Sequence, residues 1–407
     1  MRALVVVVHR YVGLAMAGFL VIAGLTGTAL VWHEPLDAWL NPDLFDAHPP
    51  SPGAEPLDPL VLRERVAAQF PQAFIPYVPL QVEPGRSVAF RLLYRPAQAA
   101  GPAGATARDD QAFVDPYSGS VLGTRRLDAL DQGRRSIMPF VYRLHYALAL
   151  GEPGRLLFGI VALLWTVDSF AGLYLTLPAR RRGPPPARPQ PSWWRRWRPA
   201  WLVRWTGGSY KLNFDLHRAG SLWMWPVFLV LAWSSVAFNL HPYYDPVMRA
   251  VLPTQPEGLA PHAAAAAQGP AMSWHDARDT GRRLMRQFAR ARGLAVQREE
   301  LLAYQPALGQ YRYAVRSDRD IRPRGLSSVT FDARSGALRR AWLPTGEAIG
   351  DTVDIWIKSL HKAEVQPAQG LVQAVVAVSG LACAVVSVTG VVIWLRKRRA
   401  RRMASAA

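Results

Sequence analysis

Four apolar segments, each long enough to cross a bilayer as a helix, constrain the fold of this chain more than any other feature. A hydrocarbon core about 30 Å thick takes about 20 consecutive apolar residues of helix. The segments cover residues 11–32, 156–177, 219–240 and 371–395. Half of the 407 residues are hydrophobic, yet 19% are charged. This mixture predicts a membrane protein with sizeable water-facing parts.

Positive charge gathers beside these segments. The net charge of +19 would suit nucleic acid, but residues 178–216 hold nine Arg or Lys residues against one acid, and six more follow residue 395. Such basic stretches stay in the cytoplasm. We therefore expect cytoplasmic N- and C-termini and no nucleic-acid partner. A cleaved signal peptide is the alternative for the first segment, but it is too long and no clean cleavage site follows.

The apolar segments divide the chain into eight parts. We expect transmembrane helices at 1–33, 141–178, 214–241 and 356–396, the second and fourth with outward extensions. A basic loop at 179–213 and a basic tail at 397–407 would be cytoplasmic, and 34–140 and 242–355 would lie outside. Each outside part contains one helix-like stretch and then strand-like stretches. The predicted fold is a membrane α-helical, four-span bundle with two small α+β domains.

The chain also reads as a tandem repeat. The pair His9-Arg10 recurs 208 residues later as His217-Arg218, and His33 recurs at the same offset as His241. The turn at 114–119 (VDPYSG) recurs at 331–336 (FDARSG), and 169–175 (SFAGLYL) resembles 387–393 (SVTGVVI). Each half is therefore predicted to be a span, an external α+β domain and a second span.

Six of the nine histidines lie at span ends, two at the inner side and four at the outer side. A single histidine there is usually a polar tip at the headgroup level, but matched pairs at matched depth point to function. At the inner side only His9 and His217 are available, and we expect no cysteine or acid to accompany them, whereas zinc wants three or four ligands. Two axial imidazoles on a haem iron fit better. The chain has one cysteine, Cys383, and no CxxCH motif. Covalent attachment of a c-type haem and a disulfide within the chain are therefore excluded.

The spacing of histidines on one helix indicates two haems. His9 and His33 are 24 residues apart, which is about 36 Å along a helix and a net turn of about 240°. One haem cannot span that distance, but one near each face could relay electrons. Because the two imidazoles do not share a helix face, the outer haem is assigned to His145 and His361. His33 and His241 are second-rank candidates, as ligands of a rearranged outer site or as groups lining its approach.

The rest of the sequence offers little conventional catalytic machinery. We find no convincing triad or carboxylate pair, so no catalytic residue is assigned. Asp168 lies within an apolar segment, where an acid is costly. It is interpreted either as a partner on the propionate side of a haem or a proton relay, or as a packing residue hydrogen-bonded beside Thr166 and Ser169. Lys358 and Lys362 flank His361 and are candidates for pairing with propionates or for a solvated basic face.

Four stretches resemble the helices of the PepSY-associated transmembrane family. They are VHRYVGLAMAGFLVIAGLTG, RLHYALALGEPGRLLFGIVALL, DLHRAGSLWMWPVFLVLAWSS and SLHKAEVQPAQGLV with its later VTGVVIWLRKRR. Residues 58–125 and 273–340 resemble the PepSY modules of that family. One departure is at the third span, where WSSVAF replaces the usual Thr-Gly.

The resemblance implies an inner-membrane reductase of ferric siderophores, with two b-type haems held by His9, His217, His145 and His361. A cytoplasmic or membrane-bound donor would supply electrons, and release of Fe(II) would serve iron uptake. Two other functions stay open. The chain could be a lipid-embedded anchor whose PepSY modules bind or regulate a periplasmic partner, or it could be a transporter that uses its histidines as proton relays.

Overall fold

A long helical bundle carries two sheets at one end. The computed structural model describes residues 1–94, 108–179, 191–256 and 272–406. Four helices in these ranges are long and apolar enough to cross a membrane. They are α1 (Arg2–Leu30), α6 (Glu152–Thr176), α8 (Gly208–Asn239) and α12 (Gln369–Ala406). Their positions agree with the four segments predicted from hydropathy.

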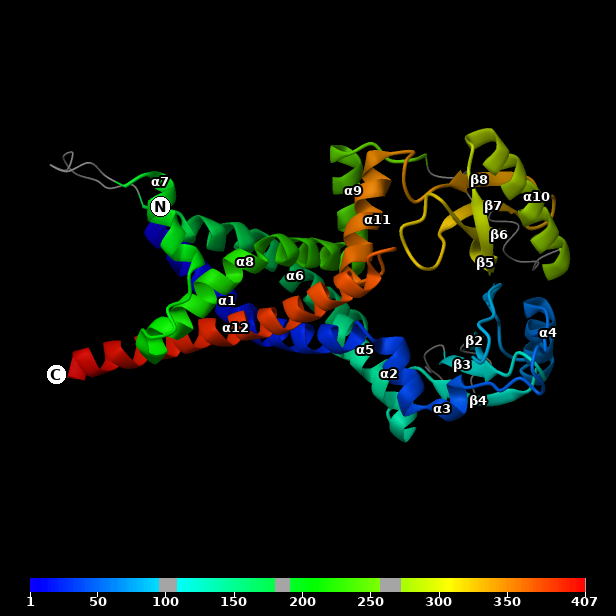
Figure 1. Ribbon diagram of the computed structural model, residues 1–407, viewed down its shortest axis with the longest axis horizontal. Helices are drawn as coiled ribbons and strands as arrows, with labels where there is room; N and C mark the ends of the chain where they lie inside the picture. Colours follow the sequence, from blue (N-terminus) through cyan, green and yellow to red (C-terminus); the bar gives the residue numbers. More distant parts are fainter. Residues whose placement is uncertain (95–107, 180–190, 257–271, 407) are drawn as a thin grey trace.

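The four helices pack side by side. Helix α1 lies against α12 and α6, and α8 lies against α6 and α12. Both chain termini lie at the end of the bundle away from the sheets (Figure 1). The short helices α7 (Trp193–Trp197) and η3 (Arg198–Trp201) lie at the same end, in the described part of the basic connection. Four arginines of that connection, Arg180, Arg181, Arg182 and Arg188, fall outside the described residues.

The outward extensions predicted for the second and fourth spans are separate helices. Helix α5 (Ile137–Ala147) ends before α6, and Leu148 after it adopts a left-handed conformation, which terminates the hydrogen-bonded turn. Helix α11 (Ile349–His361) likewise ends before α12 begins at Gln369. These breaks let α5 and α11 approach the bundle at an angle, with their last turns against it (Figure 1).

The first and third spans are also followed by short helices. Helix α1 leads into α2 (His33–Leu40) and α3 (Pro42–Phe45), and α8 leads into α9 (His241–Val251). Asp37 of α2 is buried and forms an ion pair with Arg125. The short η2 (Gly133–Ser136) then connects the first sheet to α5.

The part of the chain outside the helical bundle, here called the external part, contains two antiparallel sheets, each with one helix beside it. The smaller sheet has the order β2 (Val88–Tyr94), β3 (Arg108–Val114), β4 (Val121–Arg126), and α4 (Pro59–Gln69) lies beside it. The larger sheet has the order β1-β5-β6-β7-β8, and α10 (Trp274–Arg292) lies beside it. Its strands are β1 (Tyr77–Pro79), β5 (Val296–Gln305), β6 (Gln310–Ser317), β7 (Ser327–Asp332) and β8 (Leu338–Trp342), with η5 (Pro306–Leu308) between β5 and β6.

The two external α+β units are joined, which differs from the two self-contained domains that the sequence predicts. Strand β1 comes from the first half of the chain but pairs with β5 of the second, Val78 opposite Leu302. One continuous core includes Leu60 and Phe90 from the first half and Tyr311 from the second. Since this core buries apolar side chains from both halves, each unit depends on the other for its stability.

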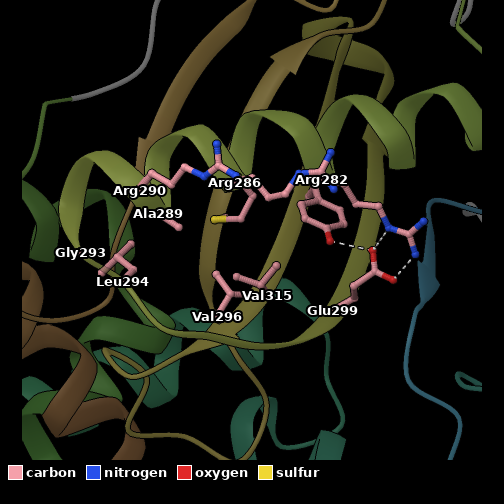
Figure 2. A pocket seen from close by; sticks show the side chains of 11 residues that line it. Arg282, Arg286, Ala289, Arg290, Gly293, Leu294, Val296, Glu299 and Val315 are labelled. Atoms are coloured by element: carbon pink, nitrogen blue, oxygen red, sulfur yellow. Dashed lines mark hydrogen bonds and ion pairs between the residues drawn. The ribbon is translucent and has the colours of Figure 1, made fainter.

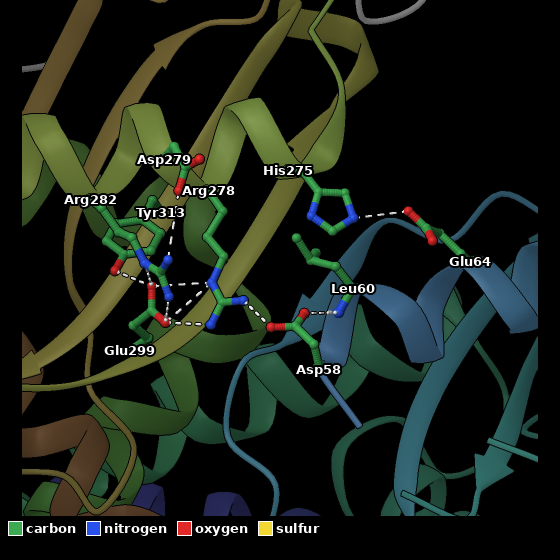
Figure 3. A network of polar contacts seen from close by, with 9 residues as sticks. All are labelled: Asp58, Leu60, Glu64, His275, Arg278, Asp279, Arg282, Glu299 and Tyr313. Carbon is green, nitrogen blue, oxygen red and sulfur yellow. Dashed lines mark hydrogen bonds and ion pairs between the residues drawn. The ribbon is translucent and has the colours of Figure 1, made fainter. Parts of the chain in front are cut away.

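An ion-pair network adds to this joint (Figure 3). Arg278 of α10 donates to Asp58, at the start of α4, and to Glu299 of β5. Arg282 also donates to Glu299, as does the Tyr313 hydroxyl. Burial alone would raise the pKa of Glu299, but the hydrogen bonds from Arg282, Arg278 and Tyr313 outweigh it and lower that pKa to about 2.

We expect the Glu299→Gln variant to lose stability at neutral pH. A carboxyl whose folded pKa is below its ordinary value stabilises the fold above that value and loses this effect as the pH falls towards the folded pKa. The loss at pH 7 should be about 2–3 kcal/mol, and it should fade between about pH 4.5 and pH 2. Thermal unfolding of the purified protein at several pH values measures it. The matched control is Glu64→Gln, because Glu64 is 59% exposed and its ion pair with His275 is exposed too, so little change is expected.

Candidate functional site: two histidine pairs in the bundle

The structure brings four of the six span-end histidines together in two pairs. His9 of α1 faces His217 of α8, with ring centroids 6.3 Å apart. His145, in the last turn of α5, faces His361, at the end of α11, with centroids 6.2 Å apart. The first pair, here called the inner pair, lies towards the end of the bundle that holds the chain termini. The second, the outer pair, lies towards the sheets.

Each of the four imidazoles is held through its Nδ1 atom. His9 Nδ1 lies 2.9 and 3.0 Å from the two carboxylate oxygens of Asp168. His217 Nδ1 lies 2.9 Å from the backbone oxygen of Val386. In the outer pair, His145 Nδ1 lies 3.0 Å from the Thr26 hydroxyl, and His361 Nδ1 lies 2.7 Å from the Ser234 hydroxyl.

These partners fix the tautomer of every ring. A carboxylate and a carbonyl can only accept, so Nδ1 of His9 and of His217 must carry the proton. The Thr26 hydroxyl already donates to the carbonyl of Ile22, and the Ser234 hydroxyl to that of Val230, so both accept from the imidazoles. All four rings therefore present the lone pair of Nε2, the nitrogen that a metal would take.

Glycines on neighbouring helices make room for three of the rings. A Cβ on Gly27 would lie 2.9 Å from Cε1 of His145, and one on Gly390 would lie 3.0 Å from Cε1 of His217. A Cβ on Gly172 would lie 3.4 Å from Cε1 of His9. A Cβ at Gly27 or Gly390 would press on the ring, so these two glycines help to set where His145 and His217 lie, whereas a Cβ at Gly172 would make an ordinary contact with His9.

A cavity of about 810 Å³ adjoins the inner pair. His9 and His217 line it together with Trp165, Trp225 and Phe228, which make its body largely apolar. Its lining also includes seven cations. The cations there come from the first turns of α1, from α8 and from the end of α12: Arg2, Arg10, Arg218, Lys397, Arg398, Arg401 and Arg402. The cavity thus suits a flat apolar group that carries negative charge at one edge.

The outer pair has its own apolar and basic neighbours. The Phe238 ring meets His361 edge to face, with centroids 5.4 Å apart. Lys358 pairs with Asp354, so its charge is already compensated. Lys362 lies over the Phe238 ring, and no carboxylate pairs with it within the described ranges. Burial lowers the pKa of Lys362 to about 8, and Arg322 and Lys358 push it the same way.

The two second-rank histidines do not join either pair. His33 is exposed at the start of α2. His241 begins α9, is 58% exposed and pairs with Asp245 on the same helix. The breaks that follow α1 and α8 turn these residues away from the bundle interior.

Asp168 has a role that the sequence did not reveal. The expectation that no acid accompanies the inner histidines is wrong, because Asp168 holds His9. Thr166 and Ser169 do not bind Asp168, because their hydroxyls donate to the backbone oxygens of Ala162 and Trp165. Residue 168 lies near the middle of the apolar segment 156–177, so only the fold shows which helix it faces.

Thr26 and Ser234 were also missed as functional residues, although the sequence carried a signal for them. They are 208 residues apart, the offset that separates His9 from His217. The departure at WSSVAF therefore keeps the hydroxyl that holds the outer imidazole and replaces only the following glycine, with Ser235 at the position that corresponds to Gly27.

A second hollow lies in the external part. A groove of about 610 Å³ lies between α10 and the larger sheet, and Figure 2 shows the side chains that line it. Arg282, Arg286 and Arg290, one helical turn apart, line one side of it. Arg282 forms an ion pair with Glu299. The groove lies on the sheet unit, apart from the helical bundle that holds the histidine pairs (Figure 1), so it is not part of the histidine site.

Comparison with known proteins places this arrangement in a family. A search of curated proteins finds none that matches the chain. The family model of the PepSY-associated TM region matches residues 6–397, which include all four long helices, both histidine pairs and the sheets between them. The chain is therefore a membrane protein that belongs to the PepSY-associated TM region family.

Proposed function

We propose that this protein is a haem-dependent ferric-chelate reductase of the bacterial inner membrane, with two b-type haems per chain. One haem would be held by His9 and His217 and the other by His145 and His361. Electrons would enter from a donor on the cytoplasmic side and leave to a ferric siderophore outside, and the Fe(II) released would be taken up.

One observation carries this proposal: both histidine pairs have the spacing of two axial ligands on one metal. A metal–imidazole bond is about 2 Å long and the ring centre lies about 1 Å further, so two such rings have centres about 6 Å apart. The observed separations are 6.3 and 6.2 Å. Within the described ranges no three His, Cys, Asp or Glu side chains gather to hold a bare ion. A porphyrin, which supplies four nitrogens itself, resolves this shortage of ligands.

The surroundings of the pairs also suit haem. The inner cavity is lined by apolar aromatic side chains and by seven cations, of which Arg218 is already paired with Asp215; this lining would suit a macrocycle and its two propionates. At the outer pair, Lys362 is a cation without a carboxylate partner in the described part of the chain, and it is available for a propionate.

The chain's own contribution is to bind and orient. When bound, haem supplies one-electron transfer between Fe(III) and Fe(II). Asp168, Val386, Thr26 and Ser234 hold the imidazole planes through Nδ1, which leaves Nε2 as the nitrogen that would bind a metal. Two of the glycines help to set where the rings lie, and Trp165, Trp225 and Phe228 keep water from the inner site. No residue is needed as nucleophile or general base.

The positions of the basic segments support the proposed direction of transfer. Both termini and the described part of the basic connection lie at the end of the inner pair, and the sheets lie at the end of the outer pair (Figure 1). Arg- and Lys-rich loops stay in the cytoplasm. The inner pair would then face the cytoplasmic donor, and the outer pair the siderophore.

An absorption spectrum of the purified full chain tests the proposal. We expect about two haems per chain, a Soret band that shifts on addition of dithionite, and reoxidation of the reduced protein by a ferric siderophore with Fe(II) trapped by a ferrous chelator. A colourless protein, after expression with haem precursors supplied, would overturn the proposal. Such a result would instead favour a membrane anchor for a periplasmic partner or a proton-relay transporter.

A further inference from the structure

The inner and outer pairs differ in the charge of the groups that hold them. Three of the four imidazoles donate to neutral acceptors, namely the Val386 carbonyl, the Thr26 hydroxyl and the Ser234 hydroxyl. His9 alone donates to a carboxylate, with both Asp168 oxygens within 3.0 Å. Asp168 is only 8% exposed, and His9 is the sole partner that the described residues offer it.

The contrast is sharpest between the two ligands of the inner pair. Helix α6 presents Gly172 to the ring of His9 and Asp168 to its Nδ1. Helix α12 presents Gly390 to the ring of His217, and Val386 to its Nδ1. In each helix the glycine follows the Nδ1 partner by four residues, one helical turn. The same local geometry thus uses a backbone carbonyl in α12 and a charged side chain in α6.

An acid in this place has an energetic cost that packing does not explain. A carboxylate inside a spanning helix is unfavourable unless it is paired, and the carbonyl contact in α12 shows that an imidazole can be oriented without one. What the carboxylate adds is electronic. A charge-assisted bond to Nδ1–H raises the basicity of a ligating imidazole, and a nearby negative charge stabilises the more positive state of a metal.

We infer that Asp168 is a positioning residue that makes the inner haem the lower-potential one of the two, and so drives electrons outward. The inference rests on the proposed function. In the transfer, one electron leaves the reduced inner site, which is oxidised, and reduces the outer site; no atom or proton moves. The neutral hydroxyls of Thr26 and Ser234 leave the outer site with the higher potential.

The Asp168→Asn variant tests this in a redox titration of the purified full chain. Asparagine keeps the size of the side chain and a hydrogen-bond acceptor but removes the charge. At a fixed potential within the lower transition, the ferrous-to-ferric ratio should rise by about tenfold, an upward shift of about 59 mV for one electron. The upper transition should stay where it is. Asp168→Glu, which restores the charge, should return the lower transition towards its original position.

Two further variants assign the transitions and separate the outcomes. The transition that disappears in His217→Ala belongs to the inner site. Ser234→Ala, the matched control at the outer site, should move only the upper transition. If the protein binds two haems and Asp168→Asn moves neither transition, or moves both equally, the inference is overturned while the proposed function stands. Loss of the inner haem in both Asp168→Asn and Asp168→Glu would also overturn the inference. Asp168 would then be needed only to keep the haem bound and not to set its potential. A preparation without haem would overturn the proposed function itself.

Discussion

Replacing His217 by alanine is expected to remove about half of the bound haem. The variant lacks one of the two imidazoles of the inner pair, whose ring centroids lie 6.3 Å apart and which would hold one haem together. The outer pair is built from α5 and α11, with contacts to Thr26 and Ser234, and shares no side chain with the inner pair. The haem-to-protein ratio and the number of redox transitions measure the effect, each falling from about two to about one.

The reciprocal variant makes the assignment specific. His361→Ala should remove the other half of the haem and leave the transition that His217→Ala abolishes. His241→Ala is the matched control, because His241 is also a span-end histidine but is exposed and bonded to Asp245; it should keep both haems. Equal loss from both sites in either single variant would contradict two independent pairs.

The histidine pairing could be predicted from the sequence because it depends on regular helix geometry. The position of a residue along an apolar helix gives its depth in the membrane, and the number of residues per turn gives the side of the helix that it faces. His9 and His33 could therefore be assigned to different haem sites without a structure. The helix ends could not be predicted as well. The predicted extensions carrying His145 and His361 are separate helices, because the turn after each depends on residues with positive φ, such as Leu148 and Ala363. Non-glycine residues in that conformation give no clear sequence signal.

The partners of the histidines show the same limit. Thr26 and Ser234 could have been found, since they are 208 residues apart, as His9 and His217 are. Asp168 could not be assigned, because a lone acid in an apolar run fits several roles until its neighbours are known. At His217 the partner is the backbone oxygen of Val386, which any residue would provide. A contact made by the backbone cannot be predicted from the type of residue at that position.

The external sheets were harder to predict because strand pairing is not local. The sequence indicated one helix-like stretch and then strand-like stretches in each of these parts, but strand β5 carries no clear signal of that kind. Its residues, Val296–Gln305, include two adjacent glutamates and an arginine, which break a simple alternation. Glu299 is tolerated there because Arg278 and Arg282 of α10 bind it. The exchange of β1 into the larger sheet likewise depends on contacts between distant parts of the chain.

A single glycine on α1 is expected to matter for both haem sites at once. Helices α1 and α12 cross closely at Gly24 and Gly380. A Cβ on Gly380 would lie 2.6 Å from the backbone oxygen of Gly24, and a Cβ on Gly24 would overlap the backbone oxygen of Gly380. Small residues permit such an approach of two spans. Helix α1 carries His9 of the inner pair and also Thr26, which holds His145 of the outer pair.

We therefore expect Gly24→Ala to lower haem occupancy at both pairs, because the added methyl pushes α1 away from α12 and shifts His9 and Thr26 together. Overpacking of this kind costs about 1–3 kcal/mol, which should weaken haem retention by about fivefold or more at each site. The haem-to-protein ratio of the monodisperse fraction, followed during transfer of haem to apomyoglobin, measures the loss. Gly18→Ala on the same helix is the matched control, because a Cβ there meets nothing within 4 Å. A Gly24→Ala protein that loses haem from one pair only would show that the two sites do not share α1 as their common support.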